Sequence, residues 1–146
     1  MKPSAHILLA KRQEQERDRL AAQLSTLLQQ HKSVQDNLDM AVKNMAIIEA
    51  QLQDNFTRGV TGAELMAMES ARHDQTARRK SLSQLIEQLQ EQERLLRRQM
   101  LAYENKGKAH IRAQENIDRQ QERHADRIAQ QKIDDMMARR LDRKVG

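Results

Sequence analysis

A repeat of large apolar residues at alternating intervals of four and three is the feature that most constrains this chain. It occupies ten positions: Leu20, Leu24, Leu27, His31, Val34, Leu38, Ala41, Met45, Ile48 and Leu52. Eight of the ten carry a sizeable aliphatic side chain. A seven-residue spacing kept over this distance is typical of a left-handed coiled coil, in which a helix buries one narrow stripe against a partner. The repeat therefore predicts a long helix that needs another helix beside it.

The partner helix is predicted to follow a single break in the sequence, "FTRGVTGAEL", residues 56 to 65. Gly59 can adopt the positive φ that ends a helix. Thr61 and Glu64 have the spacing of a capping box, in which each side chain bonds the other residue's free backbone N–H at a helix start. A short connection between two long helices makes them antiparallel neighbours. The sequence therefore predicts one helical hairpin over residues 1–146, with a helix at about 4–56, a turn at 57–61 and a second helix at about 62–143.

The second helix has a thinner stripe, at Leu65, Met68, Leu82, Ile86, Leu89, Glu93, Leu96, Met100 and Tyr103. With the turn centred near Gly59, Ala41 is expected to face about Ala77, and residues after about Asn116 have no partner within the chain. Gly107 is a plausible kink, since glycine weakens a helix interior. The predicted fold class is all-α, an antiparallel two-helix coiled-coil hairpin with a longer, overhanging C-terminal helix.

The composition argues against an ordinary globular domain. Trp is absent and the chain has one Tyr and one Phe, so the large side chains that usually fill a compact core are missing. Charged residues make up 32% of the chain, a proportion typical of long helices when glycine and proline are few. Disorder is the main alternative, but the regular repeat opposes it. The absence of Cys excludes disulfides and thiol chemistry.

No motif for catalysis or for cofactor binding is present. There is no Walker A loop, no Rossmann glycine fingerprint and no nucleophile elbow. The histidines are scattered singly along the sequence, at His6, His31, His73, His110 and His124. We therefore predict a protein that is not an enzyme, with no catalytic residue, no metal and no cofactor. His31 occupies a position of the repeat and is interpreted as a polar residue that helps to set register, with a pH-switch or ligand role as the alternative.

The charge pattern and the short apolar runs bear on location and on partners. No run approaches the roughly 18 apolar residues of a membrane span, so we expect a cytoplasmic protein with no direct membrane insertion. The net charge of +5 is modest, and the basic clusters "ARRK" (77–80) and "RRLDRK" (139–144) have acidic neighbours and no interleaved aromatics. A solvated helix face fits these clusters better than a phosphate-binding one, and we expect no nucleic-acid partner.

The C-terminal part carries a thin, uneven apolar face among many charges. Such a helix is poorly stable alone and suited to lying against another surface. Met136 and Met137 fit two interpretations equally, a partner-adapting surface or the packing of a tail-to-tail dimer.

A resemblance to a known family is carried by two stretches, the turn "RGVTGAEL" and the tail "ENIDRQQERHADRIAQQKIDDMMARR". In size, heptad helix, short turn and longer charged returning helix, the chain resembles the FliJ family of flagellar export proteins and their injectisome counterparts, the YscO-like stalk proteins of type III secretion. The resemblance implies a non-enzymatic stalk, one end of which sits in the hole of a hexameric export ATPase. Its other implied partners are the export gate membrane protein and secretion chaperones, at the cytoplasmic side of the inner membrane. Flagellar and injectisome systems both remain open.

The resemblance also implies two sets of partner-binding residues. The set expected to enter the ATPase ring is Arg119, Arg123, Arg127, Ile128, Ile133, Met137, Arg139, Arg140 and Leu141. The set expected to contact the gate or a chaperone is Met68, Arg72, His73, Arg78 and Arg79. A stalk of this kind is expected to be a monomer. The alternative is a self-associating structural coiled coil or a holdase-like chaperone, and a nucleic-acid-binding helical protein ranks third.

Overall fold

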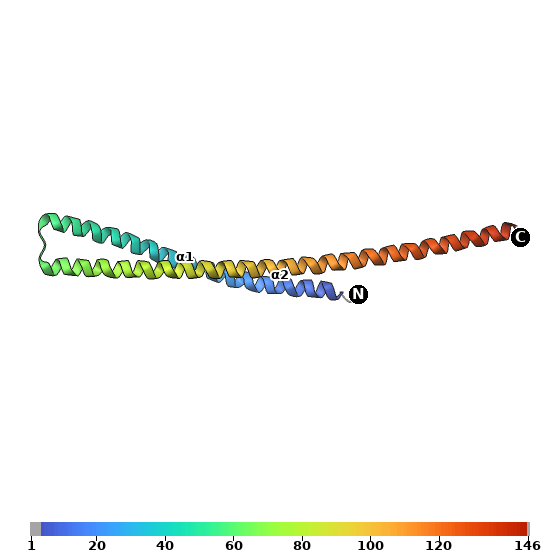
Figure 1. The fold of residues 1–146 in the computed structure, drawn as a ribbon, viewed down its shortest axis with the longest axis horizontal. Coiled ribbons are helices and arrows are strands. Elements are labelled where there is room, and N and C mark those ends of the chain that lie inside the picture. Colours follow the sequence, from blue (N-terminus) through green and yellow to red (C-terminus); the bar gives the residue numbers. More distant parts are fainter. Residues whose placement is uncertain (1–3, 146) are drawn as a thin grey trace. The chain divides into compact units, whose positions relative to one another are not determined.

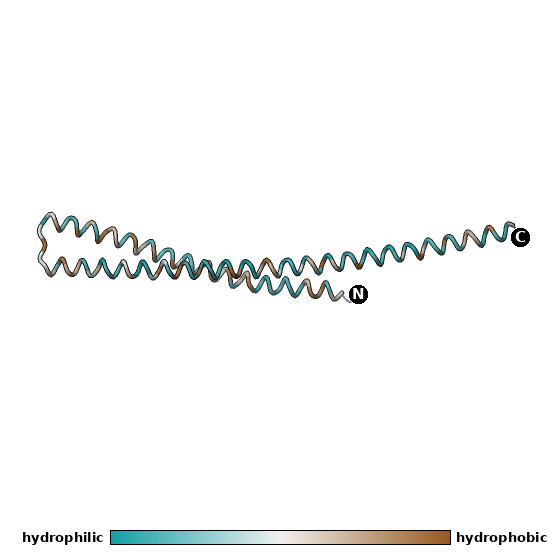
Figure 2. Tube along the Cα trace, in the orientation of Figure 1, coloured by the Kyte–Doolittle hydropathy of each residue, from teal (hydrophilic) through white to brown (hydrophobic). Residues whose placement is uncertain are grey.

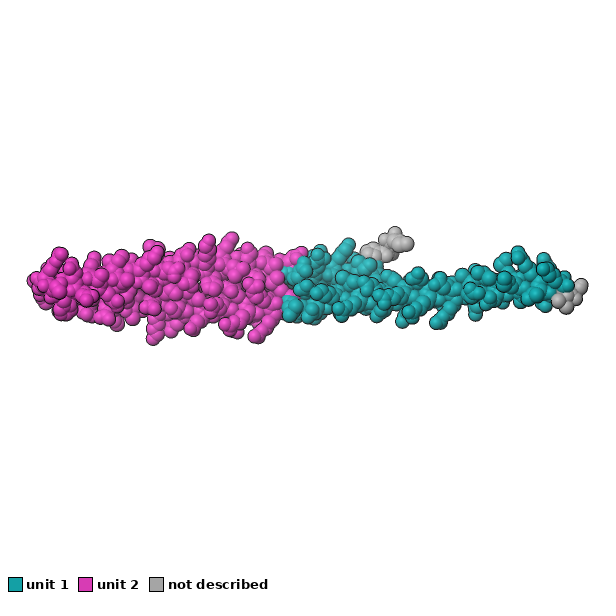
Figure 3. Space-filling model, turned by 90° about the horizontal axis from the view of Figure 1, so that it is seen from above, with its two compact units in different colours: residues 1–17, 101–146 teal, residues 18–100 magenta. Residues whose placement is uncertain are grey.

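The computed structural model describes residues 4–145 and is all-helical, with two helices and no strand among those residues. Helix α1 spans Ala5–Arg58 and helix α2 spans Gly62–Val145 (Figure 1). The chain divides into two compact units, to each of which both helices contribute (Figure 3). Unit 1 contains Met1–Arg17 and Leu101–Gly146, and unit 2 contains Asp18–Met100. Neither helix has, within the described residues, a stretch long and apolar enough to cross a bilayer.

Helix α1 begins directly after a serine cap. The backbone N–H of Ile7 donates to the Oγ of Ser4 at 3.2 Å, and the N–H of Leu8 donates to the Ser4 carbonyl at 3.1 Å. The first N–H groups of a helix have no partner within it, so a side-chain acceptor at this position stabilises the start.

Only residues 59–61 connect the two helices. Gly59 has φ +84°, as its sequence position predicts, and this left-handed conformation ends α1. Thr61 then caps α2, since its Oγ1 accepts from the N–H of Glu64 at 3.2 Å and its carbonyl accepts from the N–H of Leu65 at 3.1 Å. Helix α1 extends two residues beyond the expected end at residue 56, and α2 begins at the expected residue.

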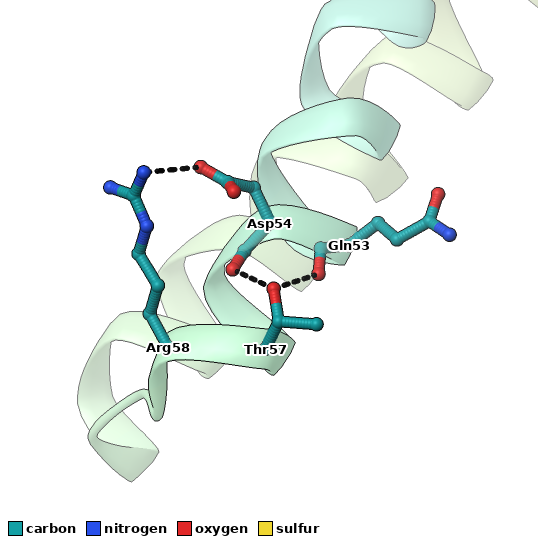
Figure 4. A network of polar contacts seen from close by, with 4 residues as sticks. All are labelled: Gln53, Asp54, Thr57 and Arg58. Atoms are coloured by element: carbon teal, nitrogen blue, oxygen red, sulfur yellow. Dashed lines mark hydrogen bonds and ion pairs between the residues drawn. The ribbon is translucent and has the colours of Figure 1, made fainter.

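The last turn of α1 is held by local polar contacts (Figure 4). The hydroxyl of Thr57 donates to the Asp54 carbonyl at 2.6 Å and lies 3.3 Å from the Gln53 carbonyl. The guanidinium of Arg58 lies 3.7 Å from the Asp54 carboxylate. A cation in the last turn also favours the negative end of the helix dipole. These contacts keep α1 helical up to the residue before Gly59.

The core of unit 2 is made by the predicted repeat. All ten repeat positions of α1 are buried or half-buried, and apolar residues recur along the helix rather than in one block (Figure 2). The residues that are buried, among those described, are Leu20, Leu24, Leu27, Ala41, Leu52, Ile86 and Leu89. All seven lie in unit 2. A seven-residue spacing thus predicted correctly which face of α1 is covered.

Within unit 2, three polar contacts link later residues of α1 with earlier residues of α2. His31 Nδ1 lies 2.6 Å from Glu93 Oε1, Glu49 Oε1 lies 4.0 Å from the Arg72 guanidinium, and Asn55 Nδ2 donates to Met68 Sδ at 3.4 Å. These pairs define the register of the two segments.

The register differs from the one expected from the sequence. Ala77 was expected to face Ala41, but Ala77 is exposed, whereas Ala41 is only 2% exposed and the most buried residue of the core. Part of the offset arises at the turn. The longer α1 moves the centre of the connection to Val60, so within unit 2 residues of α1 meet later residues of α2 than expected, as His31 does at Glu93.

In unit 1 the same spacing continues, with few apolar residues to occupy it. Four-and-three intervals counted back from Leu20 and forward from Tyr103 lead to half-buried positions: Arg17, Gln13, Ala10 and His6 on α1, and Gly107, His110 and Gln114 on α2. None of the described residues of this unit is buried. Helix α2 continues without interruption through Gly107, where a Cβ would lie 3.7 Å from Gln13 Cβ and 3.8 Å from the Ala10 carbonyl oxygen.

Candidate protein-binding site

The C-terminal part of α2, residues 115–144, is the most exposed part of unit 1. Every side chain in this stretch is exposed. A helix with no packed face has little to stabilise it besides its own backbone hydrogen bonds and side-chain pairs. One such pair is Gln130 with Asp134, whose amide and carboxylate lie 3.1 Å apart.

Four apolar residues near the end of this stretch share one face. Ile133, Met136, Met137 and Leu141 are 50–63% exposed, and their spacing of three and four keeps them within an arc of about 140° on the helix. Ile133, Met136 and Met137 line one shallow depression, and Met137 and Leu141 line the next, with Arg140 common to both. We call these four residues the C-terminal apolar face. Its exposed methionines can adapt to an irregular partner surface.

Cations accompany the C-terminal apolar face. The last helical turns contain Arg139, Arg140, Arg143 and Lys144 against the single carboxylate of Asp142, so residues 136–144 carry a net charge of +3. Arg143 and Lys144 line the same depression as Met137 and Leu141. An apolar face beside a cationic cluster at a helix C-terminus is suited to a partner surface that combines apolar contacts with carboxylates.

The residues expected to enter an ATPase ring are all exposed, but they do not form one surface. Ile133, Met137, Arg140 and Leu141 are brought together at the two depressions. Ile128 precedes Ile133 by five residues, which places it about 140° around the helix. Arg139 lines a third depression with Met136, Arg140 and Arg143, which adjoins the other two because they share Arg140. The remaining members, Arg119, Arg123 and Arg127, follow one another at intervals of four along the helix.

Three members of the C-terminal site were absent from the expected set. Met136, Arg143 and Lys144 contribute to the depressions that contain Met137, Arg140 and Leu141. Met136 had been singled out in the sequence only as one of a methionine pair, and helical spacing of three and four from Arg140 could have added Arg143 and Lys144.

The residues expected to contact a gate or chaperone are divided between inward and outward positions. Met68 is half-buried and accepts a hydrogen bond from Asn55, and Arg72 forms ion pairs with Glu49 at 4.0 Å and Glu69 at 3.9 Å. The other three, His73, Arg78 and Arg79, are exposed. A partner would therefore meet this second set only in part.

Three of the five histidines that are isolated in the sequence have a side-chain partner in the structure. His31 is paired with Glu93 in unit 2, and the Nδ1 atoms of His6 and His110 lie 3.2 Å apart in unit 1. All four residues occupy positions of the four-and-three spacing, which is the signal that could have paired them. No group of three or more His, Cys, Asp or Glu among the residues described is arranged to hold a metal ion.

Comparison with known proteins identifies no relative. No protein-family model matches the chain, and neither a curated protein nor a solved structure matches it.

Proposed function

We propose that this protein is a non-enzymatic stalk or adaptor of a type III protein export apparatus, injectisome or flagellar. In this proposal its C-terminal segment inserts into a hexameric export ATPase and couples that enzyme to the export gate and its chaperones. The observation that carries the proposal is the exposed end of α2, where the C-terminal apolar face lies beside a net charge of +3. The layout of the sequence, which resembles the FliJ and YscO-like families, supplies the identity of the partner.

The proposal includes an antiparallel coiled-coil hairpin with an overhanging end. The three-residue connection supports it, as do the paired positions His31–Glu93 in unit 2 and His6–His110 in unit 1, each of which joins α1 to α2. The exposure of every side chain from residue 115 to residue 144 supports the overhang. A stalk needs such a free end, since a helix already covered by its own chain has no face left for a ring.

The size of the C-terminal apolar face limits what it can contribute. Its four side chains are about half exposed, so covering them would contribute on the order of 1 kcal/mol each, or about 4 kcal/mol together. A micromolar complex requires about 8 kcal/mol. The cations, or contacts farther along the exposed segment, must therefore supply the rest, and binding is expected to weaken as salt concentration rises.

The direct test is titration of the full chain into a purified hexameric export ATPase, with ATP hydrolysis and ring assembly as readouts. We expect both to increase. The double variant Ile133→Ser and Met137→Ser removes about 2 kcal/mol of apolar contact, so the concentration needed for half the effect should rise roughly thirtyfold. The control is Gln131→Ser with Ala138→Ser, two exposed positions away from the apolar face, which should leave the titration unchanged. If the wild-type chain alters neither hydrolysis nor assembly, the stalk function is excluded.

The alternative function, a self-associating structural coiled coil, would use the same face between two copies of the chain. Light scattering at micromolar concentration distinguishes the two. A monomer supports the stalk. A stable dimer or tetramer that Ile133→Ser with Met137→Ser dissociates supports self-association.

A further inference from the structure

We propose that His6 and His110 form a two-histidine site for Zn²⁺ that clips the start of α1 to α2 within unit 1. Their Nδ1 atoms lie 3.2 Å apart, their ring centroids lie 5.4 Å apart, and the ring planes are tilted by 37°. Both side chains are half-buried, so each is directed toward the other helix while solvent can still reach the pair. This inference does not depend on the proposed function.

The contact between two imidazoles imposes a restriction that a metal ion removes. One Nδ1 must carry a proton and the other must offer a lone pair, since two N–H groups or two lone pairs facing each other repel. A metal ion accepts a lone pair from both rings at once. Each ring then keeps its proton on Nε2, because a ligating imidazole carries its proton on the nitrogen that does not bind the metal.

The separation of the two nitrogen atoms fits tetrahedral coordination. With Zn–N bonds of roughly 2.0–2.1 Å, ligand atoms 3.2 Å apart subtend an angle of about 103° at the ion. The tetrahedral angle is about 109°, whereas the 90° angles of square-planar or octahedral ions would need nitrogens about 2.9 Å apart. Mg²⁺ and Ca²⁺ take oxygen ligands and are not expected to bind. A separation of 3.2 Å is thus compatible with two ligands of a tetrahedral Zn²⁺ ion, which imidazole commonly binds.

Two protein ligands leave two positions of the tetrahedron to water or to another molecule. The chain has no Cys to offer a thiolate. Such a site is an exchangeable clip rather than a permanent structural zinc centre, because closed structural sites have four protein ligands. Its effect would be local, since His6 lies in the first turn of a helix segment that has no buried side chain.

The test is calorimetric titration of the full chain with Zn²⁺, repeated with single His→Gln variants. We expect one ion per chain and at least tenfold weaker binding in His6→Gln and in His110→Gln. The controls are His73→Gln and His124→Gln, which remove exposed histidines and should leave the affinity unchanged. Unchanged affinity in either paired variant would overturn the proposal, and so would one ion per two chains with Zn²⁺-dependent dimerisation.

A second measurement distinguishes a ligand from a residue needed for folding. At free Zn²⁺ about ten times above its Kd, amide hydrogen exchange in residues 5–17 should slow about tenfold, since the ion binds only the closed pair. Neither paired variant should show this slowing, even if its exchange without Zn²⁺ is already faster. Equal slowing in wild type and in the paired variants would show that Zn²⁺ acts elsewhere and would refute the clip.

Discussion

Unit 2 and unit 1 continue the same spacing of contact positions with different side chains, and the difference in burial follows from those side chains. In unit 2 leucine and isoleucine occupy enough of the positions for seven residues to be buried. In unit 1 the corresponding positions hold His, Ala, Gln, Arg, Gly and a single Tyr, and none of its described residues is buried. A regular helical spacing therefore places residues in contact without making the contact strong. The stabilising free energy depends on the apolar area at each position.

The largest expected difference in stability between the units comes from removing an apolar side chain from each. Leu24→Ala in unit 2 should lower the free energy of unfolding by about 2–3 kcal/mol, because Leu24 is buried and the cavity left behind adds to the lost burial. Ile111→Ala in unit 1 should cost under about 0.5 kcal/mol, since Ile111 is 48% exposed. Urea denaturation followed by circular dichroism measures both. Equal losses would mean that unit 1 has a core of its own.

A second test compares the polar pairs of the two units. The side chains of His31 and Glu93 are 22% and 14% exposed, so Glu93→Ala leaves a half-buried imidazole without its acceptor and should cost about 1–2 kcal/mol. Glu104 and Lys108 in unit 1 form an exposed pair at 3.4 Å within one helix, and Glu104→Ala should cost about 0.3–0.5 kcal/mol.

A double-mutant cycle on His31 and Glu93 isolates the coupling between the two side chains. A coupling near zero would show that the 2.6 Å contact does not stabilise unit 2, and the contrast with the exposed pair would then disappear.

A third test concerns two glycines. Gly107→Ala should stabilise α2 by about 0.5–1 kcal/mol, because alanine is the better helix former and the nearest atoms leave ordinary van der Waals space for a Cβ. Gly59→Ala should destabilise the protein by about 1 kcal/mol, because at φ +84° a side chain is strained even in open space. Thermal unfolding of both variants provides the measurement. A destabilising Gly107→Ala would reveal a closer approach of α1 to α2 in unit 1 than the 3.7 Å contact indicates.

Most of the fold could be predicted because its determinants are local. The covered face of α1 follows from the periodicity of its own apolar residues, and the break follows from Gly59 and Thr61, whose conformations depend on their immediate neighbours. The register could not be predicted from these local features, since it depends on how two helices slide past each other. Ala77 and Ala41 illustrate this, because periodicity gives the face of each residue but not its partner.

The candidate sites were harder to predict, since their side chains do not stand out from the many similar residues around them in the sequence. Ile133, Met137, Arg140 and Leu141 were expected to act together, and they do share neighbouring depressions. Ile128 was included with them although its position in the sequence places it on another side of the helix. The His6–His110 contact joins residues 104 positions apart, and composition gives no hint of it. Only the continuation of the spacing through polar residues brings the two together.

The three residues between α1 and α2 also decide whether the chain pairs with itself or with a copy. If residues 59–61 became helical, residues 5–145 would form one continuous rod of about 210 Å. The apolar stripe of such a rod could then be covered by a second copy of the chain, as in a domain-swapped dimer. The backbone of Gly59 and the hydroxyl of Thr61 both oppose that extension. Without these two features, the helices would pair between two copies of the chain rather than within one chain. The fold would then depend on protein concentration, while the helical content would change little.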